Sequence, residues 1–143
     1  MDEIQVNQTE NIATVTINRP EVKNAVTAPM WDELRDVFVR LGYDDTVRAV
    51  IVTGAGSDFC SGADVSAMGS GTGERVHQLE SMRKVGDCCL ALFNMPKITI
   101  ARIPGVGVGA GMNMALACDI VIASDQARFS EIFAKRGLSV DFG

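Results

Sequence analysis

The chain has 143 residues, and 13 Lys and Arg against 18 Asp and Glu give it a formal net charge of −5. With 47% hydrophobic and 22% charged residues, its composition is that of a globular domain and excludes a disordered chain. The acidic balance argues against attraction to nucleic acid or to an anionic membrane. The length alone predicts one domain over residues 1–143.

Targeting and metal-binding signals are absent from the sequence. No apolar run reaches the ~20 residues of a transmembrane helix, and no apolar signal core follows the acidic N-terminus. His77 is the only histidine, and no CxxC pair exists among the four cysteines, Cys60, Cys88, Cys89 and Cys118. The sequence therefore predicts a cytoplasmic protein with reduced thiols, no metal ion, and no membrane or nucleic-acid partner.

The first half of the chain predicts two strands and a helix. Residues 12–18 (IATVTIN) alternate in the manner of a half-buried strand, which ends at Arg19. Thr27 is the predicted N-cap of a helix whose apolar residues recur at helical spacing as far as Leu41. Residues 49–53 (AVIVT) form a continuous apolar run, which is typical of a strand buried on both faces.

The second half continues the alternation of helices and strands. Residues 76–93 predict a second amphipathic helix, and residues 98–103 (ITIARI) a third strand. A short helix over 112–118 precedes residues 120–123 (IVIA), which predict another buried strand. This order is that of an α/β fold with mainly parallel strands.

Two glycine-bounded turns, residues 60–64 (CSGAD) and 105–111 (GVGVGAG), each follow a predicted strand. Small residues let a ligand approach the main chain closely. The first N–H groups of a helix have no internal partner, so they can bind an oxyanion. Two such turns facing one another can hold one carbonyl oxygen between two donors. The alternative interpretation is that the glycines only permit tight turns.

The second turn also matches a dinucleotide-binding fingerprint. Gly105-x-Gly107-x-x-Ala110 follows a predicted strand, and Asp125 lies near the offset expected for a ribose-binding acid. Residues 111–118 leave only two turns for the crossover helix, however, which weakens the match.

A serine hydrolase is a further alternative. Ser61 precedes a glycine, but its surroundings are not the G-x-S-x-G elbow. The histidine that a hydrolase needs would have to be His77, which lies beside Gln78 and Glu80 and is better explained as a solvated side chain.

Five ordered blocks of the sequence carry a resemblance to a known family. They are NRPEVKNA (18–25), RAVIVTG (48–54) with FCSGAD (59–64), GVGVGAG (105–111) with ACD (117–119), ARF (127–129) and GL (137–138). In these blocks the chain resembles the crotonase, or enoyl-CoA hydratase/isomerase, superfamily. The resemblance implies a crotonase-like spiral of ββα units of which this chain is the N-terminal part. We therefore expect residues 1–143 to be a portion of a larger acyl-CoA-binding domain, with apolar surface left uncovered.

The resemblance also implies a substrate, a coenzyme A thioester, with no cofactor beyond that coenzyme A. The thioester carbonyl would lie between the backbone N–H groups of Ser61 and Ala110. Asp64 would orient the first turn. The other substrate-binding positions implied are Lys23, Asn24, Ala25, Gly62, Ala63, Gly109, Asn113 and Phe133. Family members form trimers, or hexamers of paired trimers, so the remaining half of the fold is expected from the same or another chain.

The sequence departs from the family at its acid and base groups. The two hydratase glutamates fall on Asn113 and Phe133, neither of which can ionise. Asp141 falls where some family isomerases carry a catalytic aspartate, and Glu131 is a weaker candidate. We therefore expect a double-bond isomerase or a hydratase-like lyase, with Asp141 as general acid and base. The alternatives are a non-catalytic CoA-ester binder and, for Asp141, a turn-capping role.

Overall fold

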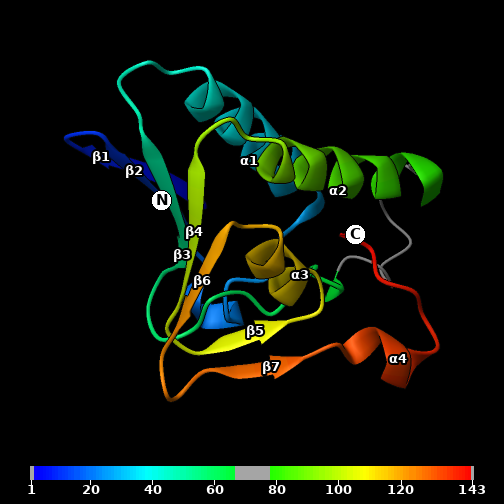
Figure 1. The fold of residues 1–143 in the computed structure, drawn as a ribbon. Helices are drawn as coiled ribbons and strands as arrows, with labels where there is room; N and C mark the ends of the chain where they lie inside the picture. The colour runs from blue at the N-terminus through cyan, green and yellow to red at the C-terminus, as the bar shows by residue number, and fades with distance from the viewer. Residues whose placement is uncertain (1, 67–77, 143) are drawn as a thin grey trace.

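A computed structural model describes residues 2–66 and 78–142, and its centre is a five-stranded sheet in the order β1-β2-β3-β4-β6 (Figure 1). Strands β1 and β2 are antiparallel, and the following pairs are parallel. Strands β5 and β7 form a separate parallel pair. The elements are β1 (Ile4–Thr9), β2 (Ile12–Ile17), η1 (Pro20–Val22), α1 (Ala28–Gly42), β3 (Ala49–Gly54), α2 (Gln78–Phe93), β4 (Ile98–Ile103), β5 (Val106–Val108), α3 (Ala110–Leu116), β6 (Ile120–Ala123), β7 (Arg128–Ser130) and α4 (Ile132–Arg136).

Helix α1 forms where the spacing of apolar residues predicts it. Thr27 is the N-cap, as expected, and its backbone N–H donates to the Met30 sulfur at 3.4 Å. Trp31, Leu34 and Phe38 are buried and recur every three or four residues along the helix. Helix α1 lies beside α2, and the two helices run together along one side of the molecule (Figure 1).

The sheet has one fully covered face. Val15 of β2 and Val52 of β3 are paired in register, and both are completely buried. The alternate residue Ile51 is only half-buried. The prediction that residues 49–53 are buried on both faces is therefore wrong. A continuous apolar run does not show by itself which face of a strand has a covering layer.

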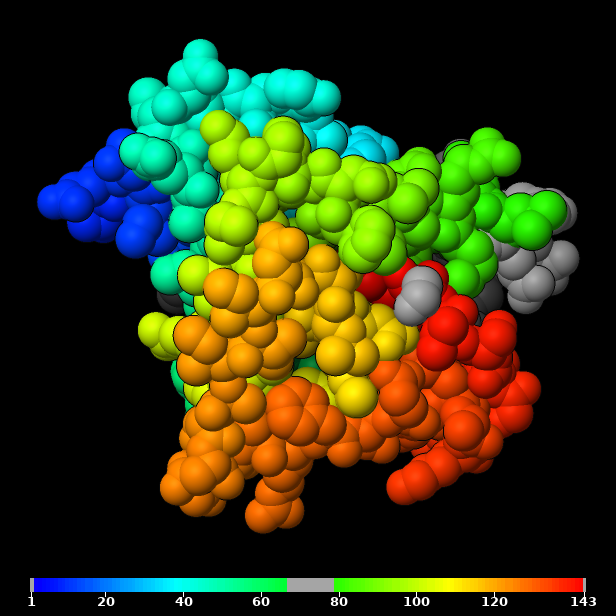
Figure 2. Space-filling view, viewed as in Figure 1, coloured from blue at the N-terminus to red at the C-terminus, as the bar shows by residue number. Residues whose placement is uncertain are grey.

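The strand predicted over residues 120–123 exists as β6, but its predicted burial is wrong. All four residues are exposed, and Ile122 is 56% exposed. Strand β6 is the edge strand beside β4, and Figure 2 shows it in orange on the surface. Within the described ranges, the sheet ends at this strand, so its apolar side chains lack the cover that the hydrophobic run suggested.

The end of the described chain returns to the core. Phe142 is buried, and its ring lies 5.8 Å from that of Trp31 in α1. Figure 2 shows this segment in red between α2 and the segment that carries β7 and α4. Asp141 directly precedes Phe142 in the chain. No helix in the described ranges is long and apolar enough to cross a membrane.

Gly86 gives a test of helix α2. It lies inside the helix, and a Cβ added there would meet no atom within 4 Å. Gly86→Ala should raise the free energy of unfolding by about 0.5–1 kcal/mol, because alanine restricts the unfolded chain and favours the helix. Urea unfolding followed by circular dichroism measures this. Gly137→Ala is the matched control: its site is equally open, but its φ of +66° should make alanine destabilising.

Candidate active site

The two glycine-bounded turns lie against each other. Cys60 and Gly107 form an isolated parallel bridge. The Cys60 N–H donates to the Val106 carbonyl at 2.9 Å, and the Val108 N–H donates to the Cys60 carbonyl at 2.9 Å. The structure thus joins two segments that are more than forty residues apart in sequence.

Two glycines allow this close approach. A Cβ on Gly111 would lie 2.3 Å from the Cys60 carbonyl oxygen, which no side chain tolerates. Gly62 has a φ of +100°, and its Cβ would lie 3.0 Å from the Val108 carbonyl oxygen and 3.5 Å from the Ala110 nitrogen. The glycines therefore bring the backbone around residues 61–63 up to the first residue of α3.

The two backbone N–H groups expected to bind the thioester oxygen differ in whether they already have a hydrogen-bond acceptor. The Ala110 N–H, at the start of α3, has no hydrogen-bond acceptor among the described residues. The Ser61 N–H donates to the Lys23 carbonyl at 3.0 Å, and the Ser61 hydroxyl donates to the Val22 carbonyl at 3.2 Å. A ligand oxygen at this site finds one donor free and has to compete with Lys23 for the other.

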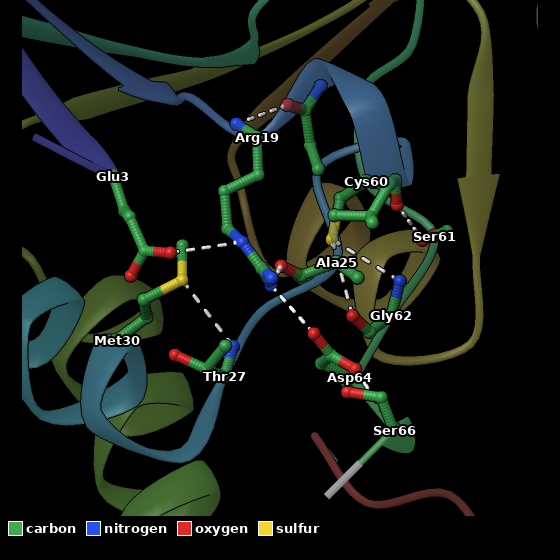
Figure 3. A network of polar contacts seen from close by, with 12 residues as sticks. Glu3, Arg19, Ala25, Thr27, Met30, Cys60, Ser61, Gly62, Asp64 and Ser66 are labelled. Carbon is green, nitrogen blue, oxygen red and sulfur yellow. Dashed lines mark hydrogen bonds and ion pairs between the residues drawn. The ribbon is translucent and has the colours of Figure 1, made fainter. Parts of the chain in front are cut away.

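The segment around Ala25 holds the first turn in place. The Val26 N–H donates to the Gly62 carbonyl at 2.9 Å, and the Asp64 N–H donates to the Val26 carbonyl at 2.8 Å. Arg19 adds an ion pair from its Nη1 to Asp64 Oδ2 at 2.8 Å, and Figure 3 shows this network. Ala63 itself is exposed. The turn is therefore shaped by a segment some forty residues earlier in the chain.

The neighbouring side chains of Lys23 and Asn24 differ in their exposure to solvent. Lys23 is exposed, whereas Asn24 is completely buried. The Asn24 amide accepts a hydrogen bond from the Arg19 N–H at 2.9 Å and donates to the carbonyls of Ala55 and Asp58 at 2.9 and 2.8 Å. All of its hydrogen-bonding groups are directed inward, so Asn24 supports the turns and leaves Lys23 facing solvent.

Three buried polar atoms have no hydrogen-bond partner within the part of the chain that the structure describes. They are Asn113 Nδ2, Glu131 Oε2 and Asp141 Oδ1. Leaving such a group unpaired costs about 1–3 kcal/mol, so unpaired groups mark places where a ligand or water completes the bonding. The side chain of Phe133 packs against Gly109, where a Cβ would lie 3.5 Å from its ring.

Burial and neighbouring charges raise the pKa values of Asp141 and of the Cys60 thiol. Burial raises the pKa of Asp141 above its ordinary value, and the negative charge of Glu131 raises it further. Backbone hydrogen bonds oppose this rise. Burial raises the pKa of the Cys60 thiol to about 12, and the charge of Asp141 contributes in the same direction. The Cys60 thiol is thus inert at neutral pH.

The two alternative patterns in the sequence gain no supporting contact from the described residues. The glycines of the dinucleotide fingerprint lie in and around β5, which pairs with β7, and Asp125 is exposed. His77, the only base available to a serine hydrolase, lies outside the described residues, as does the start of the helix expected from residue 76. Among the described residues, no cluster of His, Cys, Asp and Glu suits a metal ion.

Comparison with known proteins identifies the family. The family model for enoyl-CoA hydratase/isomerase matches residues 7–143. The chain belongs to the enoyl-CoA hydratase/isomerase family. A probable enoyl-CoA hydratase of Mycobacterium tuberculosis, echA14, is 41% identical over 137 residues, covering 96% of this chain and 53% of the relative. One of Rhodobacter capsulatus is 38% identical, covering 94% and 51%.

Solved structures place the chain in the N-terminal part of the crotonase fold. DspI of Pseudomonas aeruginosa is 33% identical with a TM-score of 0.90, covering 100% of this chain and 58% of that one. An enoyl-CoA hydratase of Mycobacterium avium subsp. paratuberculosis is 31% identical with a TM-score of 0.88, covering 100% and 55%. This family member thus spans about half the length of the curated relatives and solved structures it matches.

Several residues that shape the site had no signal in the sequence beyond the family blocks. Asp58 accepts a hydrogen bond from the Val106 N–H at 2.9 Å and so ties the first turn to the second. Arg19 lies in the NRP block, but the sequence of that block does not indicate what the arginine side chain contacts. Phe142 carries no local pattern that pairs it with Trp31. Each of these contacts joins distant parts of the chain, which local periodicity does not report.

The ion pair of Asp64 predicts a pH-dependent stability. Hydrogen bonds from Ser66 and the Arg19 guanidinium lower the pKa of Asp64 to about 2, below its ordinary value near 4. The ionised form therefore stabilises the fold above about pH 4, and that contribution is lost as the pH falls through about 2. Urea unfolding should show Asp64→Asn as less stable than wild type at pH 6, with a difference that shrinks towards pH 2. A difference that stays constant contradicts this.

Proposed function

We propose that the chain contributes to an acyl-CoA enzyme that stabilises a thioester enolate and moves a carbon–carbon double bond. Family membership supports the acyl-CoA substrate. The observation that carries the proposal is Asp141: burial raises the pKa of its carboxyl group, and its Oδ1 is buried without a hydrogen-bond partner among the described residues. A raised pKa brings a carboxyl group towards the range in which it both accepts and returns a proton.

The oxyanion of the enolate would be bound by main-chain donors. The free Ala110 N–H supplies one hydrogen bond, and the Ser61 N–H supplies the second when the thioester oxygen displaces the Lys23 carbonyl. Backbone donors do not depend on their side chains, so serine and alanine serve at these positions. One such donor typically contributes about 2.7–4 kcal/mol of transition-state stabilisation.

Proton transfer would be carried by Asp141 alone. The ionised carboxylate removes a proton from C2 of a 3-enoyl thioester. The C2–H electron pair forms a C1–C2 double bond and the carbonyl electrons move to the thioester oxygen, which gives a dienolate; when C4 takes up a proton, the carbonyl re-forms and the double bond moves from C3–C4 to C2–C3. The protonated Asp141 then returns a proton to C4, which gives the 2-enoyl thioester. Glu131 favours proton capture because its charge raises the pKa of Asp141.

Water addition is disfavoured in this proposal. The hydratase glutamates fall on Asn113, a buried amide, and on Phe133. Hydration needs one group that activates water and another that protonates the α-carbon. Asn113 instead offers its unpaired Nδ2 as a hydrogen-bond donor that orients the acyl group. The expected cytoplasmic location and trimeric or hexameric assembly of the whole protein belong to the same proposal.

Asp141→Asn in the full-length protein tests the proposed reaction. We expect double-bond migration to fall by about 10²–10⁴-fold, the usual contribution of one general acid and base, while CoA-ester affinity stays within about twofold. A panel of saturated, 2-enoyl, 3-enoyl and dienoyl CoA esters in heavy water, followed by mass spectrometry, measures deuterium entry without net water addition.

Asp125→Asn is the matched control, because Asp125 is exposed. It should keep wild-type exchange. Unchanged migration in Asp141→Asn contradicts the role of Asp141. Tight binding of CoA esters by the wild type without any turnover identifies a non-catalytic CoA-ester binder instead. A rise in melting temperature with NAD but not with CoA esters supports dinucleotide binding.

A further inference from the structure

Arg19 connects three separate parts of the chain through one guanidinium group. Its Nη1 donates to the Ala25 carbonyl at 2.7 Å and pairs with Asp64 Oδ2 at 2.8 Å. Its Nε pairs with Glu3 Oε1 at 3.0 Å. The side chain is only 16% exposed, and Figure 3 shows it lying between these partners. Such a partly buried, multiply bonded arginine is held in one orientation.

Two of the three partners of Arg19, Asp64 and Ala25, belong to the segments that form the proposed oxyanion site. Asp64 is the last residue of the turn that carries Ser61, and its other oxygen, Oδ1, accepts the Ser66 N–H at 3.0 Å. Ala25 belongs to the segment whose Lys23 carbonyl accepts the Ser61 N–H. The guanidinium therefore fixes the distance between the segment that supplies the acceptor and the turn that supplies the donor.

The backbone of Arg19 strengthens the same link. Its N–H donates to Asn24 Oδ1 at 2.9 Å, and its carbonyl accepts the Asn24 N–H at 2.8 Å. Asn24 follows Lys23 directly, and both residues have φ near +55°. Arg19 thereby holds a left-handed pair of residues, which costs conformational energy, in the position that meets Ser61.

We propose that Arg19 is a positioning residue for the thioester carbonyl: by clamping the Asp64 turn to residues 22–26, it holds the Ser61 backbone in place while the thioester oxygen takes over the Ser61 N–H from the Lys23 carbonyl. The inference rests on the proposed acyl-CoA function. Hydrogen bonds to a developing oxyanion depend steeply on geometry, and a displacement of about 1 Å can lower a rate by about 10²-fold. A lysine at position 19 keeps the positive charge but lacks the fork that reaches Ala25, Asp64 and Glu3 together.

Arg19→Lys in the full-length protein is the first test. The probe is a saturated acyl-CoA with a ¹³C-labelled thioester carbonyl, and the measurement is the infrared stretching frequency of that carbonyl when bound. We expect the wild type to lower the frequency relative to free ligand and Arg19→Lys to lower it less. With turnover substrate, kcat should fall by about 10-fold to 10²-fold, while KM changes by less than about threefold.

Arg102→Lys, at an exposed arginine of β4, is the matched control and should keep the wild-type carbonyl frequency. A wild type that binds the probe without any frequency change overturns the proposed oxyanion site itself. A wild-type shift that is fully retained in Arg19→Lys overturns only the role of Arg19.

A second variant keeps the test decisive if Arg19→Lys does not fold. Asp64→Asn breaks the same ion pair from the other side and leaves the bond from Arg19 to Ala25 in place. A reduced frequency shift in Asp64→Asn supports the clamp. A wild-type shift in folded Asp64→Asn overturns it.

Discussion

The candidate site depends on a backbone-to-backbone contact that leaves no room for side chains. A Cβ at Gly111 would lie 2.3 Å from the Cys60 carbonyl, and one at Gly105 would lie 2.2 Å from the Ser57 carbonyl. This approach lets Cys60 exchange hydrogen bonds with both ends of β5. The two proposed oxyanion donors, the N–H groups of Ser61 and Ala110, are consequently main-chain groups whose positions depend on these glycines and not on the side chains of residues 61 and 110.

Main-chain donors in a turn of small residues have to be held in position by another segment, because the turn itself has few side chains that could restrict its backbone. Here that segment is the one after β2, which forms backbone hydrogen bonds to Gly62 and Asp64 and places Arg19 against the carboxylate of Asp64. Asn24 contributes by filling the buried space between this segment and the carbonyls that precede the turn. Rigidity at the site therefore comes from polar bonds between distant segments as much as from the hydrophobic core.

The sequence predicted well those features that depend on neighbours along the chain. Thr27 is the N-cap of helix α1, as predicted, because capping and spacing are local, and the small residues of the two turns mark them in the sequence. Burial was misjudged at Ile51 and in β6, since the covering layer lies elsewhere in the fold. Strand β5 was hidden within a glycine-rich run, and the packing of Phe142 on Trp31 has no sequence pattern at all.

The polar atoms around Asp141 bear on which reaction the site can support. A fully paired network would be more stable, yet Glu131 Oε2, Asp141 Oδ1 and Asn113 Nδ2 are all buried without partners. Burial and, to a smaller extent, the charge of Glu131 raise the pKa of Asp141, and the third group is an amide donor that cannot exchange a proton in catalysis. In the proposed reaction, Asp141 would transfer a proton between two carbons of one substrate while the amide of Asn113 donates a hydrogen bond to the acyl group. Hydration would need one group to activate water and another to protonate the α-carbon, and Asn113 and Phe133 occupy the positions expected for the two hydratase glutamates.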